Sequence, residues 1–429
     1  MLIPSIIIFV ITYILMFAFQ KFRPYIAITS AIVFIVLGYI TQEFGLKEMF
    51  TQYIDFNVLL MITGTMITVS LMIDSKMPSL MADLLIEKVP NILWATVVLS
   101  LFSGIVSAFI DNVATVLMVA PIALELAKKK NINPIGMIIA IAVSSNLQGA
   151  ATLVGDTTSI LLGGYANMNF LDFFFIEGKP SIFFATELGA LASALLLFVI
   201  FRKEKQPIEA GERTVVTDYV PSILLLLTVL TLIVASFFNI EFSLLNGTIC
   251  MSIAIIGLVY VIIKNKTFKA TVKPIKDIDF QTLLLLFGLF MVIGGITEFG
   301  VIDSIAELFK KMSGGNLFLM YTIIVWLSVA FSAFIDNIPY VATMLPVVKM
   351  IGLSFGLTNP LLLYFGLLCG ATLGGNLTPI GASANITALG LLRKEGYEVK
   401  NSDFLKIGIP FTLAAIIPAY IFIWFVFKP

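Results

Sequence analysis

The chain alternates along its whole length between long apolar runs and short polar segments. Apolar runs of roughly 18–20 residues are long enough to cross a bilayer as helices. The pattern predicts simple crossing helices at about 2–19, 25–40, 56–73, 181–201, 220–237, 244–263, 280–298 and 407–427. Two amphipathic segments, 77–89 and 300–312, are expected to lie at the membrane surface. We therefore expect an all-α polytopic membrane protein.

Four further apolar regions are interrupted by polar residues. Regions 92–126 and 317–350 carry a polar tip near the middle, which is typical of a re-entrant hairpin. Regions 134–166 and 358–390 have centres rich in Gly, Thr, Ser and Asn, which is typical of a helix broken at membrane depth. Irregular backbone at that depth is tolerated only where it is buried in protein or lines a cavity. The sequence thus predicts two hairpins and two broken helices.

The chain is an internal duplication. Residues Ser107–Asn112 recur unchanged as Ser332–Asn337, at an offset of 225. The other landmarks at nearly the same offset are Pro121 with Pro346, Asp55-Phe56 with Asp279-Phe280, and Thr152–Gly155 with Thr378–Gly381. We expect a first repeat over 1–205, a cytoplasmic linker over 206–219 and a second repeat over 220–429. Each repeat would contain five crossings, and this odd number inverts the second repeat relative to the first.

Charge supports this topology. Hydrophobic residues make up 59% of the chain and charged ones only 12%, against about 25% charged in soluble domains. With the N-terminus outside, 20 of the 26 basic residues fall on inner segments, as the positive-inside rule requires. We therefore expect a multi-pass protein of the plasma membrane with both termini outside. No lysine or arginine lies inside a predicted span, and the balanced net charge gives no indication of a nucleic-acid partner.

The hairpin tips supply the first candidate site residues, which are Asp111, Asn112, Asp336 and Asn337. A carboxylate inside a span costs about 2.5–3.5 kcal/mol on insertion scales, so intramembrane acids are candidates for function. Asp and Asn are also favoured N-caps of a returning helix. A cap does not need a charge, and the Asp-Asn pair is present in both halves. We therefore favour binding of a cation or proton at the tips, with capping as a simultaneous role.

The broken helices supply the remaining candidates, which share amide, hydroxyl or carboxylate groups: Asn146, Thr152, Asp156, Thr157, Ser159, Asn376, Thr378, Ser383 and Asn385. Freed carbonyl groups at such breaks can coordinate Na⁺. Close packing through small residues is the alternative; it accounts for the glycines and alanines but poorly for the clustered polar residues. Asp156 has Ala382 as its counterpart. It either titrates or caps a helix over Thr157–Gly164, and both interpretations remain open.

Three motifs carry a resemblance to a known family: Ser107–Pro121, Ala151–Asp156 and Gly370–Asn385. They are similar to the ion transporter superfamily, within it to the clade of arsenite permeases, sodium/proton antiporters of type D and the melanosomal pink-eyed-dilution protein, with a citrate-transporter-like domain. The resemblance implies a homodimer with a scaffold part and a transport part that slides in an elevator-like manner. It also implies Na⁺ near Asn112, Asn337 and the adjacent broken-helix carbonyls. The melanosomal type continues after its Gly-Asp with Pro-Pro-Asn, whereas this chain has Thr157-Thr158-Ser159.

These features predict a secondary active transporter. The chain has no histidine, no thiolate cluster and no nucleotide-binding loop, so we do not expect an enzyme or a cofactor. Multivalent anions are disfavoured because the spans offer no basic residue. The first hypothesis is proton-coupled efflux of a small inorganic solute of the arsenite type, and the alternative is a sodium/proton antiporter. A sodium-coupled carboxylate carrier and a passive anion channel are less favoured. The coupling ion is H⁺ or Na⁺, the expected partners are the bilayer and a small solute, and a cytoplasmic ATPase partner is left open.

Overall fold

The computed structural model of the chain describes residues 1–208, 213–238, 240 and 242–429. Residues 209–212 of the expected linker 206–219 lie outside this described part. The described chain is predominantly helical and contains one short two-stranded hairpin. The predicted all-α fold is confirmed.

A helix is present at each of the eight simple spans. Their bounds are α1 Leu2–Ala18, α2 Arg23–Thr41, α4 Phe56–Asp74, α10 Ile182–Ile200, α11 Val220–Ser236, α12 Leu245–Asn265, α14 Phe280–Glu298 and α20 Asn401–Phe427. Six of them are long and apolar enough to cross a membrane; α1 and α11, with 17 residues each, are slightly shorter. The long apolar runs therefore become helices within a few residues of the predicted ends.

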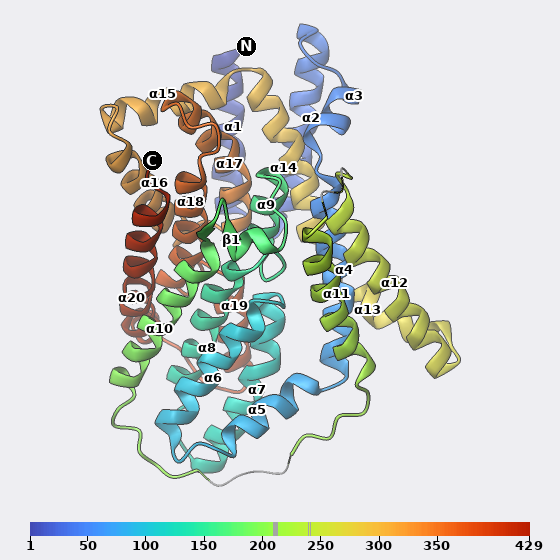
Figure 1. The fold of residues 1–429 in the computed structure, drawn as a ribbon, viewed down its shortest axis with the longest axis vertical. Coiled ribbons are helices and arrows are strands. Elements are labelled where there is room, and N and C mark those ends of the chain that lie inside the picture. Colours follow the sequence, from blue (N-terminus) through green and yellow to red (C-terminus); the bar gives the residue numbers. More distant parts are fainter. Residues whose placement is uncertain (209–212, 239, 241) are drawn as a thin grey trace.

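The interrupted regions form helix pairs and broken helices. The pairs are α6 Ile92–Ser107 with α7 Asn112–Lys130, and α16 Leu317–Ser332 with α17 Asn337–Ser354. The broken helices are α8 Ile135–Gln148, η3 Gly149–Ala151 and α9 Thr157–Tyr165, and then α18 Leu361–Gly374, η6 Gly375–Leu377 and α19 Ser383–Lys394. Figure 1 shows α6 and α7 toward the lower end of the molecule, and α16 and α17 toward the upper end. The two hairpins therefore approach the centre from opposite ends.

The shorter elements connect these parts. They are η1 Gln20–Phe22, α3 Leu46–Glu48, the π-helical turn η2 Met49–Tyr53, α5 Met77–Ile86, η4 Leu171–Phe173, β1 Phe175–Ile176, β2 Lys179–Pro180, η5 Phe268–Thr271, α13 Val272–Lys276 and α15 Val301–Ser313. The strands β1 and β2 are antiparallel, with Phe175 opposite Pro180. The helix α5 lies across the lower end and α15 across the upper end (Figure 1). These two helices occupy the positions of the predicted amphipathic segments.

The halves of the chain interlock through equivalent helices. The helix α4 packs along α12, and α2 packs along α14. Each of these two pairs contains one helix from the first half and one from the second. Gly64 lies at the first crossing, where a Cβ would be 2.5 Å from the carbonyl carbon of Cys250. Its counterpart Gly288 lies at the second, where a Cβ would be 2.8 Å from the amide nitrogen of Ile28. Both crossings therefore require a residue without a side chain.

The two broken helices form the centre of the bundle. Every residue of α18 is buried, and α8 is buried from Met137 to its end. A segment buried on all sides has no contact with lipid, so its polar groups must find partners within the protein. This requirement concentrates polar chemistry where the breaks meet the hairpin tips.

Candidate functional site

The aspartates at the two hairpin tips cap the returning helices. Asp111 Oδ1 accepts hydrogen bonds from the amides of Val113 and Ala114 at 3.0 and 3.1 Å. Asp336 Oδ1 accepts one from the amide of Ile338 at 3.1 Å. These amides begin a helix and have no partner within it, which is why a side-chain acceptor is favoured there. The predicted capping role is confirmed. It uses one oxygen of each carboxylate and leaves the second oxygen for another partner.

A chain of buried amides connects the first tip with both breaks. Asn112 Nδ2 donates to Asn146 Oδ1 at 3.0 Å. Asn146 Nδ2 in turn donates to Asn376 Oδ1 at 3.0 Å and to the carbonyl oxygen of Thr372 at 2.7 Å. Asn376 Nδ2 donates to the carbonyl oxygen of Val143 at 2.9 Å. Side chains from the two halves, far apart in sequence, are thus joined in one hydrogen-bond network.

Each break is also bonded to the tip of its own hairpin. The hydroxyl of Thr152 donates to the carbonyl oxygen of Ala108, and that of Thr378 donates to the carbonyl oxygen of Ala333. The Asn385 amide spans the second break, with bonds to the carbonyl oxygens of Gly375 at 3.0 Å and Thr378 at 3.2 Å. The Ser159 hydroxyl makes a longer contact of 3.4 Å to the Gly149 carbonyl oxygen at the first break. Tip and break form one unit in each half.

Backbone carbonyl groups converge beside an equivalent glycine in each unit. A Cβ on Gly155 would lie 2.6 Å from the carbonyl oxygen of Gly149, 2.7 Å from that of Ala108 and 2.8 Å from that of Ser107. The corresponding oxygens around Gly381 belong to Gly375, Ser332 and Ala333, at 2.6, 2.9 and 3.0 Å. Oxygen atoms are the ligands that hard cations prefer, and freed carbonyls at broken helices bind Na⁺ in other transporters. The arrangement is chemically suited to a small cation.

Asp156 is held at the start of α9. Its Oδ1 accepts from the amide of Thr157 at 2.9 Å, and its Oδ2 accepts from the hydroxyl of Thr158 at 2.6 Å. The carboxylate is buried, with a relative exposure of 7%. The predicted capping role is confirmed, and the residue's titration remains a prediction.

Tips and breaks meet at a cavity of about 420 Å³. Eight of the thirteen predicted site residues line it: Asp111, Asn112, Asn146, Asp156, Thr157, Asp336, Asn337 and Ser383. The other five, Thr152, Ser159, Asn376, Thr378 and Asn385, do not line it and instead make the bonds described above. The structure therefore brings the Asp-Asn pairs of both tips to one cavity. Eight predicted residues line this cavity, and the other five hold its walls through hydrogen bonds.

Charged residues that are not among the predicted site residues also line the cavity. Asp279 caps α14 through the amide of Thr282 at 3.0 Å, and Asp277 accepts from the hydroxyl of Ser70 at 2.6 Å. Both line the cavity together with Lys273, which pairs with Asp74. The sequence marked Asp279 only as a landmark of the duplication. A polar residue before a helix is most simply a cap, so its place at the cavity required the tertiary structure.

The predicted spans contain no basic residue, but two basic side chains reach the site from outside those spans. In the structure Arg23, at the start of α2, reaches the second tip, where its Nη1 lies 2.9 Å from Asp336 Oδ2. Lys273 lies at the cavity itself. Arg23 and Lys273 lie outside the predicted spans in sequence, and the packing of the helices places them at the site.

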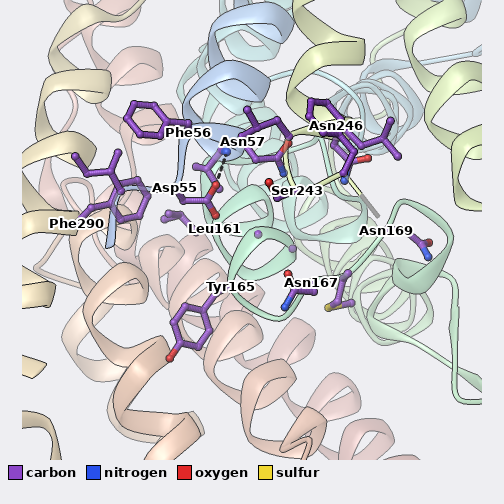
Figure 2. Close-up of a pocket in the computed structure, with 18 of the residues that line it drawn as sticks. Asp55, Phe56, Asn57, Leu161, Tyr165, Asn167, Asn169, Ser243, Asn246 and Phe290 are labelled. Atoms are coloured by element: carbon purple, nitrogen blue, oxygen red, sulfur yellow. Dashed lines mark hydrogen bonds between the residues drawn. The ribbon is translucent and has the colours of Figure 1, made fainter. Parts of the chain in front are cut away.

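A second and larger cavity, of about 1140 Å³, lies at the other end of α4. Figure 2 shows Asp55 and Asn57 at the start of α4 in the same pocket wall as Tyr165 at the end of α9 and Asn167 beyond it. Ser243 and Asn246, near the start of α12, line the same cavity. Asp55 is the counterpart of Asp279 in the duplication. The two cavities therefore carry equivalent aspartates at their walls, one in each half.

A bundle of apolar helices that encloses a polar cavity between two hairpin tips and two helix breaks defines a polytopic membrane transporter. Comparison with known proteins identifies the family. A family model described as citrate transporter (CitMHS) matches residues 11–370, and the chain belongs to this family. The resemblance to the ion transporter superfamily is confirmed, and the match is to transporters rather than enzymes.

Two curated relatives show how far the similarity extends. The chain is 29% identical over 444 residues to an uncharacterized transporter of Mycobacterium tuberculosis. This alignment covers 99% of the chain and 98% of the relative. It is also 25% identical over 439 residues to the P protein of Mus musculus. That alignment covers 84% of the chain but only 53% of the longer P protein.

A solved structure shares the fold. The crystal structure of the YdaH transporter of Alcanivorax borkumensis superposes with a TM-score of 0.64 at 13% sequence identity. The superposition covers 95% of this chain and 98% of the YdaH chain. The likeness therefore extends over almost the whole chain and shows a shared fold.

Proposed function

We propose that this chain is a sodium/proton antiporter that exchanges the two ions at the first hairpin tip. The observation that carries the proposal is the charge of the 420 Å³ cavity. Five carboxylates line it, from Asp111, Asp156, Asp277, Asp279 and Asp336, and two basic side chains, Lys273 at the wall and Arg23 on Asp336, oppose them. This excess of negative charge attracts cations and repels multivalent anions.

The proposed cation site consists of Asp111, Asn112 and Asp156 with the carbonyl groups beside Gly155. A Na⁺ ion would take oxygen ligands from these groups. Protonation of Asp111 removes the charge that holds the cation, so H⁺ and Na⁺ compete for one carboxylate. Such competition couples the two ions, because the site carries one or the other but not both.

The volume of the cavity favours a second candidate function, which is proton-coupled efflux of a small neutral oxyacid of the arsenite type. A volume of about 420 Å³ falls within the range of roughly 300–1,000 Å³ typical of small-molecule pockets. A single ion does not need that space. In this case a site aspartate would carry the proton while the amides and hydroxyls around it bind the solute.

Topology and assembly belong to the proposal as well. The two cavities at opposite ends of α4 support alternating access by an elevator-like movement of the hairpins and broken helices against the interlocked helices. We place the protein in the plasma membrane with both termini outside and five crossings in each half, as the distribution of basic residues indicates. A homodimer is the proposed assembly.

Transport in inverted membrane vesicles tests the function. An imposed pH gradient, acid inside, should be dissipated on addition of Na⁺ in vesicles that contain the protein, and not in vesicles from cells without it. If arsenite uptake is driven by the gradient while Na⁺ has no effect, the second candidate replaces the first. If neither solute responds to the gradient, both candidates are wrong.

A further inference from the structure

Arg23 ties the turn between α1 and α2 to the second hairpin tip. Its Nη1 lies 2.9 Å from Asp336 Oδ2, and its Nε donates to the carbonyl oxygen of Met16 at 3.2 Å. The two side chains are largely buried, with relative exposures of 13% for Arg23 and 21% for Asp336. Asp336 Oδ1 is already used as the cap of α17. Both oxygens of this carboxylate thus have partners.

The same region holds the second hairpin by further bonds. The Tyr13 hydroxyl on α1 donates to the carbonyl oxygen of Pro339 at 2.9 Å and also bonds to the hydroxyl of Thr343. Both partners belong to α17, the returning helix of that hairpin. The α1–α2 unit therefore contacts the second hairpin at three points, two on α17 and one at its N-cap Asp336, and the guanidinium is fixed relative to the carboxylate that it neutralises.

The first tip lacks an equivalent partner. The helix α12 corresponds to α2 in the duplication, and at the offset of 224 or 225 the counterpart of Arg23 is Gly247 or Thr248, neither of which carries a charge. Within the described residues no salt bridge joins Asp111 to a lysine or arginine. The two halves therefore differ at their tips: Asp336 is neutralised by Arg23, whereas Asp111 has no equivalent ion pair among the described residues.

We propose that Arg23 is the resident counter-cation of Asp336 and limits the chain to a single transported cation, at Asp111. This inference rests on the proposed sodium/proton exchange and deepens it. An arginine stays charged at every physiological pH. A Na⁺ ion at Asp336 would lie beside this fixed positive charge in a poorly solvated place, where like charges repel strongly. Two similar tips therefore act differently, one as a binding site and the other as an internal ion pair.

Binding of radiolabelled Na⁺ to the purified full-length protein, counted per chain at saturation, tests the inference. The wild-type protein should bind one Na⁺. Arg23→Gln removes the counter-cation and should raise the count to two, and the double variant Arg23→Gln/Asp336→Asn should return it to one. Lys21→Gln removes an exposed charge from the same turn and serves as the matched control, with an expected count of one.

A single substitution at the tip keeps the test decisive if Arg23→Gln does not fold. Asp336→Asn should still bind one Na⁺, because the lost carboxylate belongs to the internal pair. A count of one in folded Arg23→Gln, or of zero in Asp336→Asn, overturns the inference while sodium binding by the wild type stands. A count of zero in the wild type contradicts the sodium/proton exchange itself, and the inference falls with it.

Discussion

Asn146 bonds to side chains or carbonyl groups from both halves of the chain. It accepts from Asn112 and donates to Asn376 and to the carbonyl oxygen of Thr372, all within the buried centre. Removing a partner from a buried polar group leaves that group without compensation for its lost hydration. Loss of the Asn146 side chain would therefore lower the stability of the fold, because its buried hydrogen-bond partners would be left unpaired.

Substitution of Asn146 by Ala should therefore lower the free energy of unfolding by about 1–3 kcal/mol. Thermal unfolding of the purified protein in detergent measures the effect as a reduced midpoint. Asn265→Ala is the matched control, because Asn265 is exposed and, among the described residues, its side chain bonds only to the Val261 carbonyl of its own helix. Equal midpoints for Asn146→Ala and Asn265→Ala would show that the buried network does not stabilise the fold.

A residue pair outside the spans gives a pH-dependent prediction. The Arg213 guanidinium bonds to both carboxylate oxygens of Glu87, at 2.6 and 2.8 Å, and holds the pKa of Glu87 below its usual value of 4.5. A lowered pKa in the folded state gives stability that is present above the unfolded-state pKa and is lost as the pH falls through the folded one. The difference in thermal midpoint between wild type and Glu87→Gln should be small and constant from pH 6 to 8, and should shrink below about pH 4.5. A difference that grows as the pH is lowered would contradict this assignment.

At the scale of elements, the crossings of α4 with α12 and of α2 with α14 hold the halves together. Gly64→Ala should destabilise the protein by about 1–3 kcal/mol, because the new methyl group would lie 2.5 Å from the Cys250 backbone. Gly390→Ala introduces the same methyl group on α19, where nothing lies within 4 Å, and should be neutral or slightly stabilising. Thermal midpoints of the two variants compare the positions directly. A destabilised Gly390→Ala beside an unaffected Gly64→Ala would refute the proposed crossing.

The sequence could predict most of the elements but only part of the site. Long apolar runs predict helices because lipid offers the backbone no other hydrogen-bond partner. The repeated Asp-Asn tips and the polar breaks predicted eight of the residues that line the cavity. Arg23 and Asp277 were missed because their positions depend on how helices pack, which periodicity does not encode. The hairpin β1–β2 and the turn η2 were too short to give a hydrophobic pattern.

At the scale of the whole molecule, both termini lie toward the upper end in Figure 1, the end where α15 crosses. The excess of basic residues on the opposite segments predicts that this end lies outside. A C-terminal fusion to alkaline phosphatase should therefore be active, and a C-terminal fusion to green fluorescent protein should be dark. The inner linker, at Arg213, is the matched position for fusions with the opposite result. A bright C-terminal fluorescent fusion would reverse the orientation.

The central claim is that a carboxylate at the first hairpin tip exchanges Na⁺ for H⁺. The most direct test uses purified protein in liposomes that contain a pH-sensitive dye, with an outward Na⁺ gradient imposed. Wild-type protein should acidify the interior as Na⁺ leaves, and Asp111→Asn should reduce that rate at least about tenfold, which corresponds to roughly 1.4 kcal/mol or more. Glu125→Gln, an exposed position on the same helix α7, should behave as wild type. An Asp111→Asn protein that acidifies the interior as fast as wild type would contradict the account.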